Sequence, residues 1–401
     1  MNAIVRSMGN DLYYIGASDR RTALFESMYP VAQGMSYNSY LLLDEKTALF
    51  DTVDRAVCPE FLANLNCALH GRALDYVIVQ HMEPDHCAAL HEVLARYPQA
   101  QVICTAGAAK MIAQFFGVDI SARGRTVREG ETLCTGAHTL TFIMAPRVLW
   151  PEVMMTWDAQ ARTLFSADAF GTFGALDGSL FADERGGSAQ WLPEARRYYT
   201  NIVGKYGPQV QAVLKKAAGL DIARICPLHG PIWQKEIAWL MHKYGQWSAY
   251  TPEDKAVLIV CGSVYGGTEA AARLLATHLA EGGVSDIVLH DVSKTHVSEL
   301  IAQAFRCSHI VLAAITYNAG IFTPMKNFLL DLQSHALRAR SYSLIENGSW
   351  APLCGKQMDE MLGQMADMRK VGDTVTLRSA LNADSRKALL ALGDALLNDL
   401  K

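Results

Sequence analysis

The feature that most constrains the fold is a regular alternation of apolar, strand-like runs with helical stretches from residue 256 onward. Because a helix that connects two parallel strands must cover one face of their sheet, this alternation is typical of a doubly wound α/β sheet. The expected strands are 256–261, 287–292, 309–313 and 342–345, and the expected helices are 269–281, 297–305, 324–334 and 356–366. The sequence therefore predicts a parallel-sheet domain in this part of the chain.

The residues before this alternation are richer in strands. A hairpin is expected from 38–43 and 47–51, further strands at 76–79, 101–104, 139–144 and 163–166, and helices at 194–206 and 208–218. A chain of 401 residues is long enough for two cores. The polar segment 248–254, with Pro252, precedes the first strand of the second pattern and is the expected linker. We therefore expect one domain at 1–250 and another at 254–401.

Charge and composition exclude several classes of protein. A formal net charge of −4 without a Lys/Arg run gives no basic field for nucleic acid. No apolar run approaches the roughly 20 residues that span a bilayer, and the start of the chain lacks a signal-peptide layout, so we expect a cytoplasmic protein. The nine cysteines include no Cys-x-x-Cys pair, which disfavours a rubredoxin-type centre within the chain.

The strongest chemical signal is a cluster of potential metal ligands directly after the strand 76–79. It consists of His81, Glu83, Asp85 and His86. Alternation in an extended segment places the first three on one side, and a turn into a helix lets His86 point back toward them. Any one of these residues is common in a polar loop, where an Asp often caps a helix. Four together favour a metal site with room for two ions.

This segment resembles the His-x-His-x-Asp-His signature of the metallo-β-lactamase superfamily, with Glu83 in the place of the second histidine. The same replacement is found in flavodiiron proteins, and a carboxylate at this position suits iron better than hydrolytic zinc. The later family ligands match Asp168 and His229. The resemblance implies an αββα metallo-β-lactamase-like sandwich in which Asp168 bridges two irons. One iron is expected on His81 and Glu83, and the other on Asp85, His86 and His229.

One ligand of the family is missing. Leu149 stands where the family has a histidine, just before Trp150-Pro151-Glu152, and leucine cannot coordinate a metal. The nearest candidate substitute, His138, lies at the other end of a strand, and we expect it to be a surface or edge residue rather than a ligand. The first metal is therefore expected to bind more weakly than its neighbour, with water in the vacant position.

The second domain carries three polar, glycine-containing loops, each after an expected strand. Parallel strands bring such loops to one edge of the sheet, where doubly wound folds bind their ligands. The first lacks the lysine of a nucleotide-triphosphate loop and the spacing of a dinucleotide fingerprint, but its hydroxyls and free N–H groups suit a phosphate. The loops are Ser263, Val264, Tyr265, Gly266, Gly267 and Thr268; Thr316, Tyr317, Asn318, Ala319 and Gly320; and Asn347, Gly348, Ser349 and Trp350.

These loops resemble the phosphate loop and the two flavin-flanking loops of flavodoxin, so the resemblance implies a bound FMN. Trp350 or Tyr317 is then expected to stack on the flavin ring, unless either simply packs. The order of the two domains is itself that of flavodiiron proteins. The chain stops at Lys401, so we expect a separate electron donor, either a rubredoxin-like protein or a reduced deazaflavin.

The leading hypothesis is therefore an oxidoreductase that reduces dioxygen to water or nitric oxide to nitrous oxide at a diiron site, with electrons relayed by FMN. The resemblance implies a homodimer or a dimer of dimers, in which the FMN of one subunit serves the metal site of another. Two alternatives stay open. One is a zinc hydrolase, which leaves the flavin domain unexplained, and the other is an FMN electron-transfer protein whose metal site is impaired by Leu149.

Overall fold

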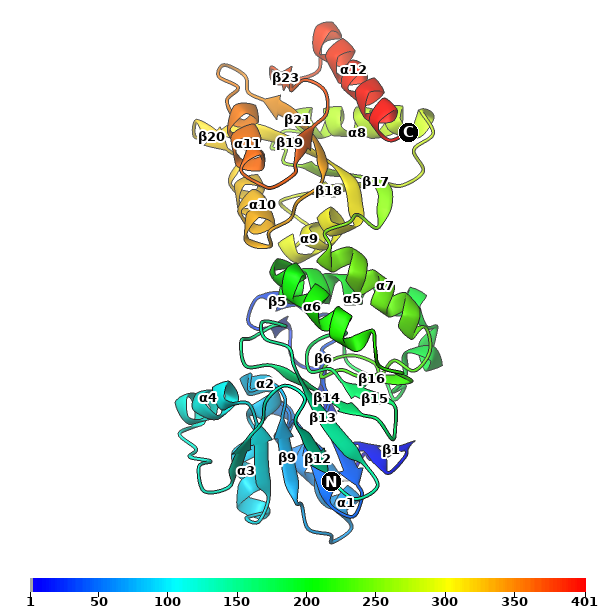
Figure 1. Ribbon diagram of the computed structural model, residues 1–401. Helices are drawn as coiled ribbons and strands as arrows, with labels where there is room; N and C mark the ends of the chain where they lie inside the picture. The colour runs from blue at the N-terminus through cyan, green and yellow to red at the C-terminus, as the bar shows by residue number, and fades with distance from the viewer. Residues whose placement is uncertain (1–2) are drawn as a thin grey trace. The chain divides into compact units, whose positions relative to one another are not determined.

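The computed structural model describes residues 3–401, which divide into two compact units. The first unit ends at Tyr244 and the second begins at Gly245 (Figure 1). The division falls inside helix α7 (Ile237–Ser248), shortly before the segment expected to be the linker.

The first unit contains a mixed seven-stranded sheet in the order β1-β2-β7-β8-β9-β10-β11. Its strands are β1 (Arg6–Gly9), β2 (Leu12–Tyr14), β7 (Tyr40–Leu43), β8 (Thr47–Phe50), β9 (Tyr76–Val79), β10 (Gln101–Cys104) and β11 (Gly124–Thr126). Strands β7 and β8 form the predicted antiparallel hairpin, whereas β8, β9, β10 and β11 run parallel. Helices follow the parallel strands: α1 (Cys58–Leu69), α2 (Pro84–Cys87), α3 (Leu90–Arg96) and α4 (Ala106–Phe116).

A second, five-stranded sheet has the order β12-β13-β14-β15-β16. Its strands are β12 (Thr132–Cys134), β13 (Thr139–Met144), β14 (Met154–Asp158), β15 (Thr163–Phe165) and β16 (Arg224–Cys226), and helices α5 (Ser188–Tyr198) and α6 (Gly207–Ala217) connect β15 to β16. Two short ribbons pair β3 (Ala17–Asp19) with β6 (Met35–Tyr37) and β4 (Leu24–Phe25) with β5 (Tyr29–Pro30). Short 3-10 turns lie at Arg55–Val57, Ala182–Arg185 and Gly204–Tyr206.

The core of this unit lies between the two sheets. Alternate residues of each strand face it, such as Tyr40 and Leu42 of β7 and Leu140 and Phe142 of β13. The ring of Phe50 from one sheet stacks on that of Phe165 from the other, with centroids 3.8 Å apart and planes at 10°. The period of two in these strands is the reason that one face of each sheet can be fully apolar. The expected sandwich, with helices on its outer faces, is confirmed.

The second unit is a parallel sheet in the order β18-β17-β19-β21-β22, with β23 also paired to β21 and β20 to β19. The strands are β17 (Asp254–Cys261), β18 (Ile287–Asp291), β19 (Cys307–Tyr317), β20 (Gly320–Ile321), β21 (Ser341–Asn347), β22 (Arg369–Lys370) and β23 (Val375–Leu377). The helices are α8 (Gly267–Glu281), α9 (Val297–Arg306), α10 (Thr323–Ser334), α11 (Cys354–Gly363) and α12 (Ala383–Asp399). This is the predicted doubly wound order, whose switch point lies between β17 and β19.

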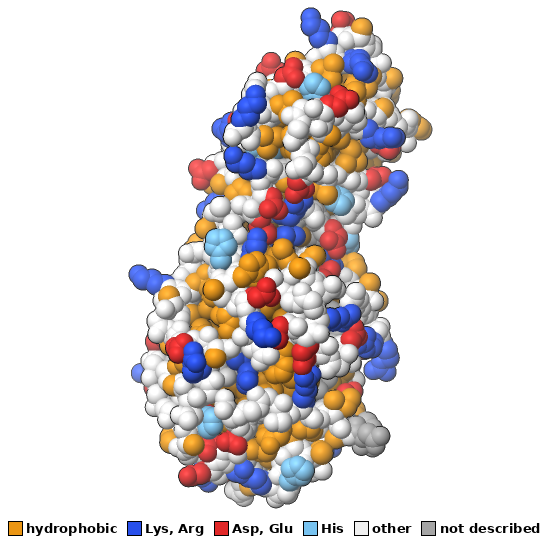
Figure 2. Space-filling view, turned by 90° about the vertical axis from the view of Figure 1, so that its right-hand side faces the viewer, with side chains coloured by type: hydrophobic (Ala, Val, Ile, Leu, Met, Phe, Trp, Pro, Cys, Tyr) orange, Lys and Arg blue, Asp and Glu red, His pale blue; other side chains and the backbone are white. Residues whose placement is uncertain are grey.

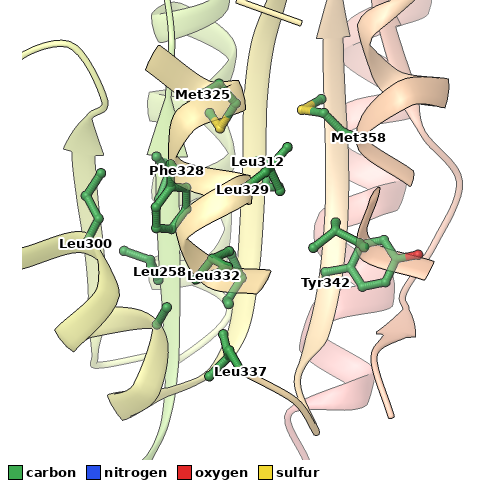
Figure 3. Packing of buried hydrophobic residues seen from close by; sticks show 14 of the residues in the cluster. Leu258, Leu300, Leu312, Met325, Phe328, Leu329, Leu332, Leu337, Tyr342 and Met358 are labelled. Atoms are coloured by element: carbon green, nitrogen blue, oxygen red, sulfur yellow. The ribbon is translucent and has the colours of Figure 1, made fainter. Parts of the chain in front are cut away.

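Helices cover both faces of this sheet (Figure 1). Helices α8 and α12 pack on one face, and α9, α10 and α11 pack on the other. Figure 3 shows the second face, where Phe328 and Leu329 of α10 lie against Leu258 of β17 and Leu312 of β19. Burial of each such side chain contributes about 1.5–3 kcal/mol.

Two expected elements differ from the structure. The helix predicted at 194–206 begins earlier, at Ser188, and passes through a π-helical turn (Tyr199–Val203). Pro193 lies inside this helix and not at its start, so this proline does not mark a boundary. The loop expected at Thr316–Gly320 is a tight hairpin in which Thr316 and Tyr317 still belong to β19 and only Asn318 and Ala319 turn.

Charged side chains of both signs are interspersed over the face shown in Figure 2. Among residues 3–401, no helix combines the length and the apolar character that a membrane crossing requires.

Candidate metal centre and cofactor loops

The segment after β9 is fixed by a buried carboxylate. Asp51, directly after β8, accepts hydrogen bonds from the backbone N–H groups of Gln80 and His81 at 2.8 and 3.2 Å and from the Gln80 side chain at 2.9 Å. Burial raises the pKa of Asp51 to about 6. The loop then enters α2 at Pro84, whose position in the first helical turn needs no N–H. This geometry directs His81, Glu83 and His86 to the same side.

The two distant ligands come from the second sheet. Asp168 follows β15, and His229 follows β16, the parallel neighbour of β15. The Nδ1–H of His229 donates to the carbonyl of Ser36 at 2.7 Å, so its Nε2 carries the lone pair. Both side chains are buried. The carboxyl ends of parallel strands in the two sheets therefore supply one shared site.

The six predicted residues form two groups of three, whose ligand atoms lie within 4.8 Å of one another in each group: His81, Glu83 and Asp168; and Asp85, His86 and His229. In the first group, His81 Nε2 lies 2.9 Å from Glu83 Oε2 and 3.1 Å from Asp168 Oδ2. In the second, His86 Nε2 and His229 Nε2 lie 3.3 and 3.2 Å from Asp85 Oδ2. Asp168 Oδ1 lies 3.2 Å from His86 Nε2. Asp168 thus presents one oxygen to each group.

The donor atoms of these groups fit metal ions. Both carboxylate oxygens of Asp85, Asp168 Oδ1 and the Nε2 atoms of His86 and His229 are buried without a hydrogen-bond partner. An unpaired buried polar atom is costly, and several that converge are better explained by a shared cation than by contacts with one another. Carboxylate oxygens and imidazole nitrogens in this ratio are a donor set that iron accepts.

The electrostatics of the site favour a cation as well. Burial alone would lower the pKa of His81, but the carboxylates of Asp168, Glu152 and Glu83 raise it well above the ordinary value. Burial would also lower the pKa of His86, but the carboxylates of Asp85 and Asp168 outweigh this effect and raise the pKa to about 9. A metal ion at these imidazoles would compete with protons for the same nitrogen atoms.

Glu152 is a partner of the site that the sequence did not reveal as such. Its buried Oε1 lies 2.8 Å from His81 Nδ1 and accepts the N–H of Met82 at 3.0 Å, which leaves His81 Nε2 free to bind a metal. The ring of Trp150 stands edge-on to that of His81 at 5.6 Å. The Trp-Pro-Glu segment after Leu149 therefore lies beside the first group, although Leu149 itself offers no donor.

The expectation for His138 was wrong in one respect. The side chain is buried rather than at the surface, and its Nδ1 lies 2.7 Å from Asp158 Oδ2. It lies beside the start of β13, where its backbone N–H donates to Asp44. His138 belongs to neither group of candidate ligands.

In the second unit, the phosphate-type loop joins β17 to α8. Ser263 Oγ accepts the N–H of Gly266, whose φ of +85° needs a glycine. At Gly267 a Cβ would lie 2.1 Å from the carbonyl of Ser379, so a side chain is excluded there. The buried Thr268 hydroxyl receives a hydrogen bond from Asn347 Nδ2 at 3.2 Å and keeps its own proton for a ligand.

The remaining predicted loop residues lie at the same sheet edge, at and just beyond the carboxyl ends of β19 and β21. Asn347 also bonds the backbone of Ser379, and Ser379 Oγ bonds Ser349 Oγ at 2.8 Å, so a fourth segment, which the sequence did not indicate, joins this edge. Trp350 is 89% exposed and Tyr317 is 50% exposed. Neither aromatic ring is therefore buried in the core.

Comparison with known proteins agrees with this geometry. Residues 35–230 match the family described as ODP family beta lactamase. The anaerobic nitric oxide reductase flavorubredoxin of Aeromonas hydrophila is 29% identical over 368 residues, which cover 89% of this chain and 72% of that protein. The rubredoxin oxygen:oxidoreductase of Desulfovibrio gigas superposes with a TM-score of 0.92 at 25% identity, over 99% of this chain and 98% of that one. The chain is therefore similar to flavodiiron proteins in sequence and in fold.

The flavodiiron fold extends over both units. The flavodiiron protein of Giardia intestinalis has a TM-score of 0.91 at 22% identity, over 100% of this chain and 98% of that one, which shows a common fold. The two candidate ligand groups lie in the matched residues 35–230, and the flavodoxin-like unit follows.

Proposed function

We propose that this flavodiiron oxidoreductase reduces dioxygen to water or nitric oxide to nitrous oxide at a diiron centre, with electrons supplied through FMN. The observation that carries the proposal is the pair of ligand groups that share Asp168. His81, Glu83 and Asp168 would hold one iron. Asp85, His86, Asp168 and His229 would hold the other.

The arrangement of the side chains suits a redox metal more than a hydrolytic one. Iron bound here would supply redox chemistry and an open coordination position for a small gas. Glu83 adds a carboxylate where a hydrolytic zinc site of this superfamily uses an imidazole, and this favours a harder ion that changes its charge. Glu152 and the Ser36 carbonyl fix the tautomers of His81 and His229, so both present Nε2 lone pairs inward.

The second unit would bind FMN at the edge formed by β17, β19 and β21. Ser263, Thr268 and the N-terminal N–H groups of α8 are the proposed phosphate site. The loops that carry Tyr317 and Trp350 would flank the flavin, because both rings are exposed at this edge. FMN bound here would supply electron transfer, and the loops would position it.

The partners we propose follow from the chemistry. Electrons would come from a rubredoxin-like protein or a reduced deazaflavin. A homodimer or a dimer of dimers would bring the FMN of one subunit to the metal site of another. Exposed Tyr265 and Trp350 beside the flavin loops are available to such a contact.

A second candidate function is an FMN electron carrier with an impaired metal site. It is favoured by a single feature, Leu149, which removes one donor. The six other ligands are present and converge, and this geometry favours the reductase.

The proposal is tested by nitric oxide under anaerobic conditions. The protein is loaded with iron and FMN and reduced, and nitrous oxide formation and flavin reoxidation are followed after nitric oxide is added. Wild type should form nitrous oxide as the flavin is reoxidised, whereas Asp168→Asn should not, because it weakens the shared bridge. The contrary result is that wild type and Asp168→Asn reoxidise the flavin equally slowly and form no nitrous oxide. If the reduced protein then passes electrons to a one-electron protein acceptor, the electron-carrier function replaces the reductase function.

A further inference from the structure

A strained turn lies at the sheet edge that carries the three predicted flavin loops. Between β23 and α12, the N–H of Ala380 donates to the carbonyl of Arg378 at 2.9 Å, which closes a three-residue turn with Ser379 at its centre. The φ of Ser379 is +71°. Turns of this size with a positive φ are rare and strained, and residues in such conformations are concentrated at functional sites. The contacts of Ser379 give a reason for this conformation.

The main chain of the turn holds the side-chain amide of Asn347 at two points. The N–H of Ser379 donates to Asn347 Oδ1 at 2.9 Å, and the carbonyl of Ser379 accepts from Asn347 Nδ2 at 3.1 Å. A backbone N–H can only donate, and a backbone carbonyl can only accept. The two bonds therefore fix which end of the amide is the oxygen and which is the nitrogen, because a flipped amide would lose both.

The fixed amide determines the hydrogen-bonding role of Thr268. The same Nδ2 of Asn347 donates to Thr268 Oγ1, 3.2 Å away, so the hydroxyl oxygen is an acceptor toward Asn347. Thr268 is 1% exposed, and within residues 3–401 its hydroxyl makes no other hydrogen bond. The hydroxyl proton is therefore left for a ligand.

The turn contacts two of the predicted flavin loops. A Cβ at Gly267 would lie 2.1 Å from the carbonyl of Ser379, so the main chain of the turn lies directly against the loop after β17. On the other side, Ser379 Oγ bonds Ser349 Oγ at 2.8 Å, and the carbonyl of Leu377 accepts the N–H of Gly348 at 3.1 Å. The turn at Ser379 is therefore held between the loop after β17 and the loop after β21.

We propose, on the basis of the FMN binding proposed above, that the turn at Ser379 is a positioning element that makes this site selective for a phosphorylated flavin over riboflavin. Through Asn347, it makes the Thr268 hydroxyl a hydrogen-bond donor toward the ligand. Phosphate oxygens carry negative charge, and a hydrogen bond to a charged acceptor is about twice as strong as one to a neutral acceptor. The terminal hydroxyl of riboflavin is neutral and would gain less from the same donor.

The test measures the dissociation constants of FMN and of riboflavin for the flavin-free, full-length chain by the change in flavin fluorescence. The readout is the ratio of the two constants, because a variant that only loosens the fold weakens both. Thr268→Ala should lower the preference for FMN by about 10-fold. Asn347→Asp should lower it at least as much, because a carboxylate there accepts the Thr268 proton and repels phosphate. The matched control is Thr376→Ala, which removes a hydroxyl of β23 that bonds Glu346, and it should keep the wild-type preference.

Two variants of Ser379 test the turn itself. Ser379→Gly keeps the N–H and the carbonyl and adopts a positive φ readily, so its preference for FMN should be that of wild type. Ser379→Val opposes the conformation, because a positive φ is unfavourable for a β-branched residue, and it should lower the preference by about 10-fold. Should Ser379→Val fail to fold, the result for Asn347→Asp decides.

The outcomes separate this proposal from the FMN binding on which it rests. If wild type binds neither flavin, the proposed FMN function fails together with this inference. If wild type prefers FMN, and Asn347→Asp and Ser379→Val keep that preference, the positioning role is refuted and the FMN function stands. If Ser379→Val weakens FMN and riboflavin equally, the turn only supports the fold, and the positioning role is likewise refuted.

Discussion

Replacement of Glu152 by alanine should weaken the first metal without a change in any of the six predicted ligands. The carboxylate of Glu152 is 4% exposed, and its Oε1 receives hydrogen bonds from both His81 Nδ1 and the Met82 N–H. A hydrogen bond to a charged group contributes about 1.5–3 kcal/mol. If one such bond is lost from the metal-bound state, affinity falls by about 10- to 100-fold, since every 1.4 kcal/mol is a factor of ten.

The assay compares Glu152→Ala with Glu152→Gln by anaerobic Fe²⁺ titration. Glutamine keeps an oxygen that accepts the same hydrogen bonds but loses the charge, so it should give a smaller decrease in affinity. Thermal unfolding of the metal-free variants shows whether the fold is retained. Wild-type affinity for both irons in a folded Glu152→Ala variant would refute the role assigned to this carboxylate, because His81 would then be held equally well without it.

Three further predictions concern other parts of the chain. Thr268→Ala should weaken FMN binding by about 1–3 kcal/mol, measured by flavin fluorescence, whereas Thr268→Ser should bind as wild type does. Asp44→Ala should lower the free energy of unfolding by about 1–3 kcal/mol at pH 7. Despite burial, hydrogen bonds hold the pKa of Asp44 at about 2. The difference in the free energy of unfolding between wild type and Asp44→Ala, measured by urea denaturation, should therefore persist above about pH 4 and shrink as the pH falls toward 2. The buried Arg340 donates hydrogen bonds to the carbonyls of Ala304, Phe305 and Tyr250. Arg340→Met should therefore lower the free energy of unfolding by about 3 kcal/mol or more, and Arg340→Lys should lower it by less. Chemical denaturation measures both changes.

Much of the fold follows from local patterns. The hairpin of β7 and β8 and the strand and helix sequence of the second unit could be predicted because each has its own period of apolar residues. The start of α5 could not, because Pro193 and the glycines before Ser188 suggest a loop, and only packing in the tertiary structure overrides this. Likewise, β19 continues through Tyr317 because the hairpin with β20 supplies hydrogen-bond partners that a local pattern does not show.

The residues of the candidate site were likewise predictable from the sequence only in part. Four ligands lie within one short segment, so His81, Glu83, Asp85 and His86 could be recognised from spacing alone. Glu152 acts across a long distance in sequence, on His81, and an isolated glutamate carries no signal of this kind.

The central claim is tested most directly by the cofactor content of protein purified without oxygen. Iron is measured by elemental analysis, zinc in the same sample, and flavin by its absorbance after release and separation from any dinucleotide. The structure predicts about two irons and one FMN per chain, with negligible zinc, because the two ligand groups share Asp168 and three loops meet at one sheet edge. Zinc in place of iron, or a flavin-free protein, would contradict the account.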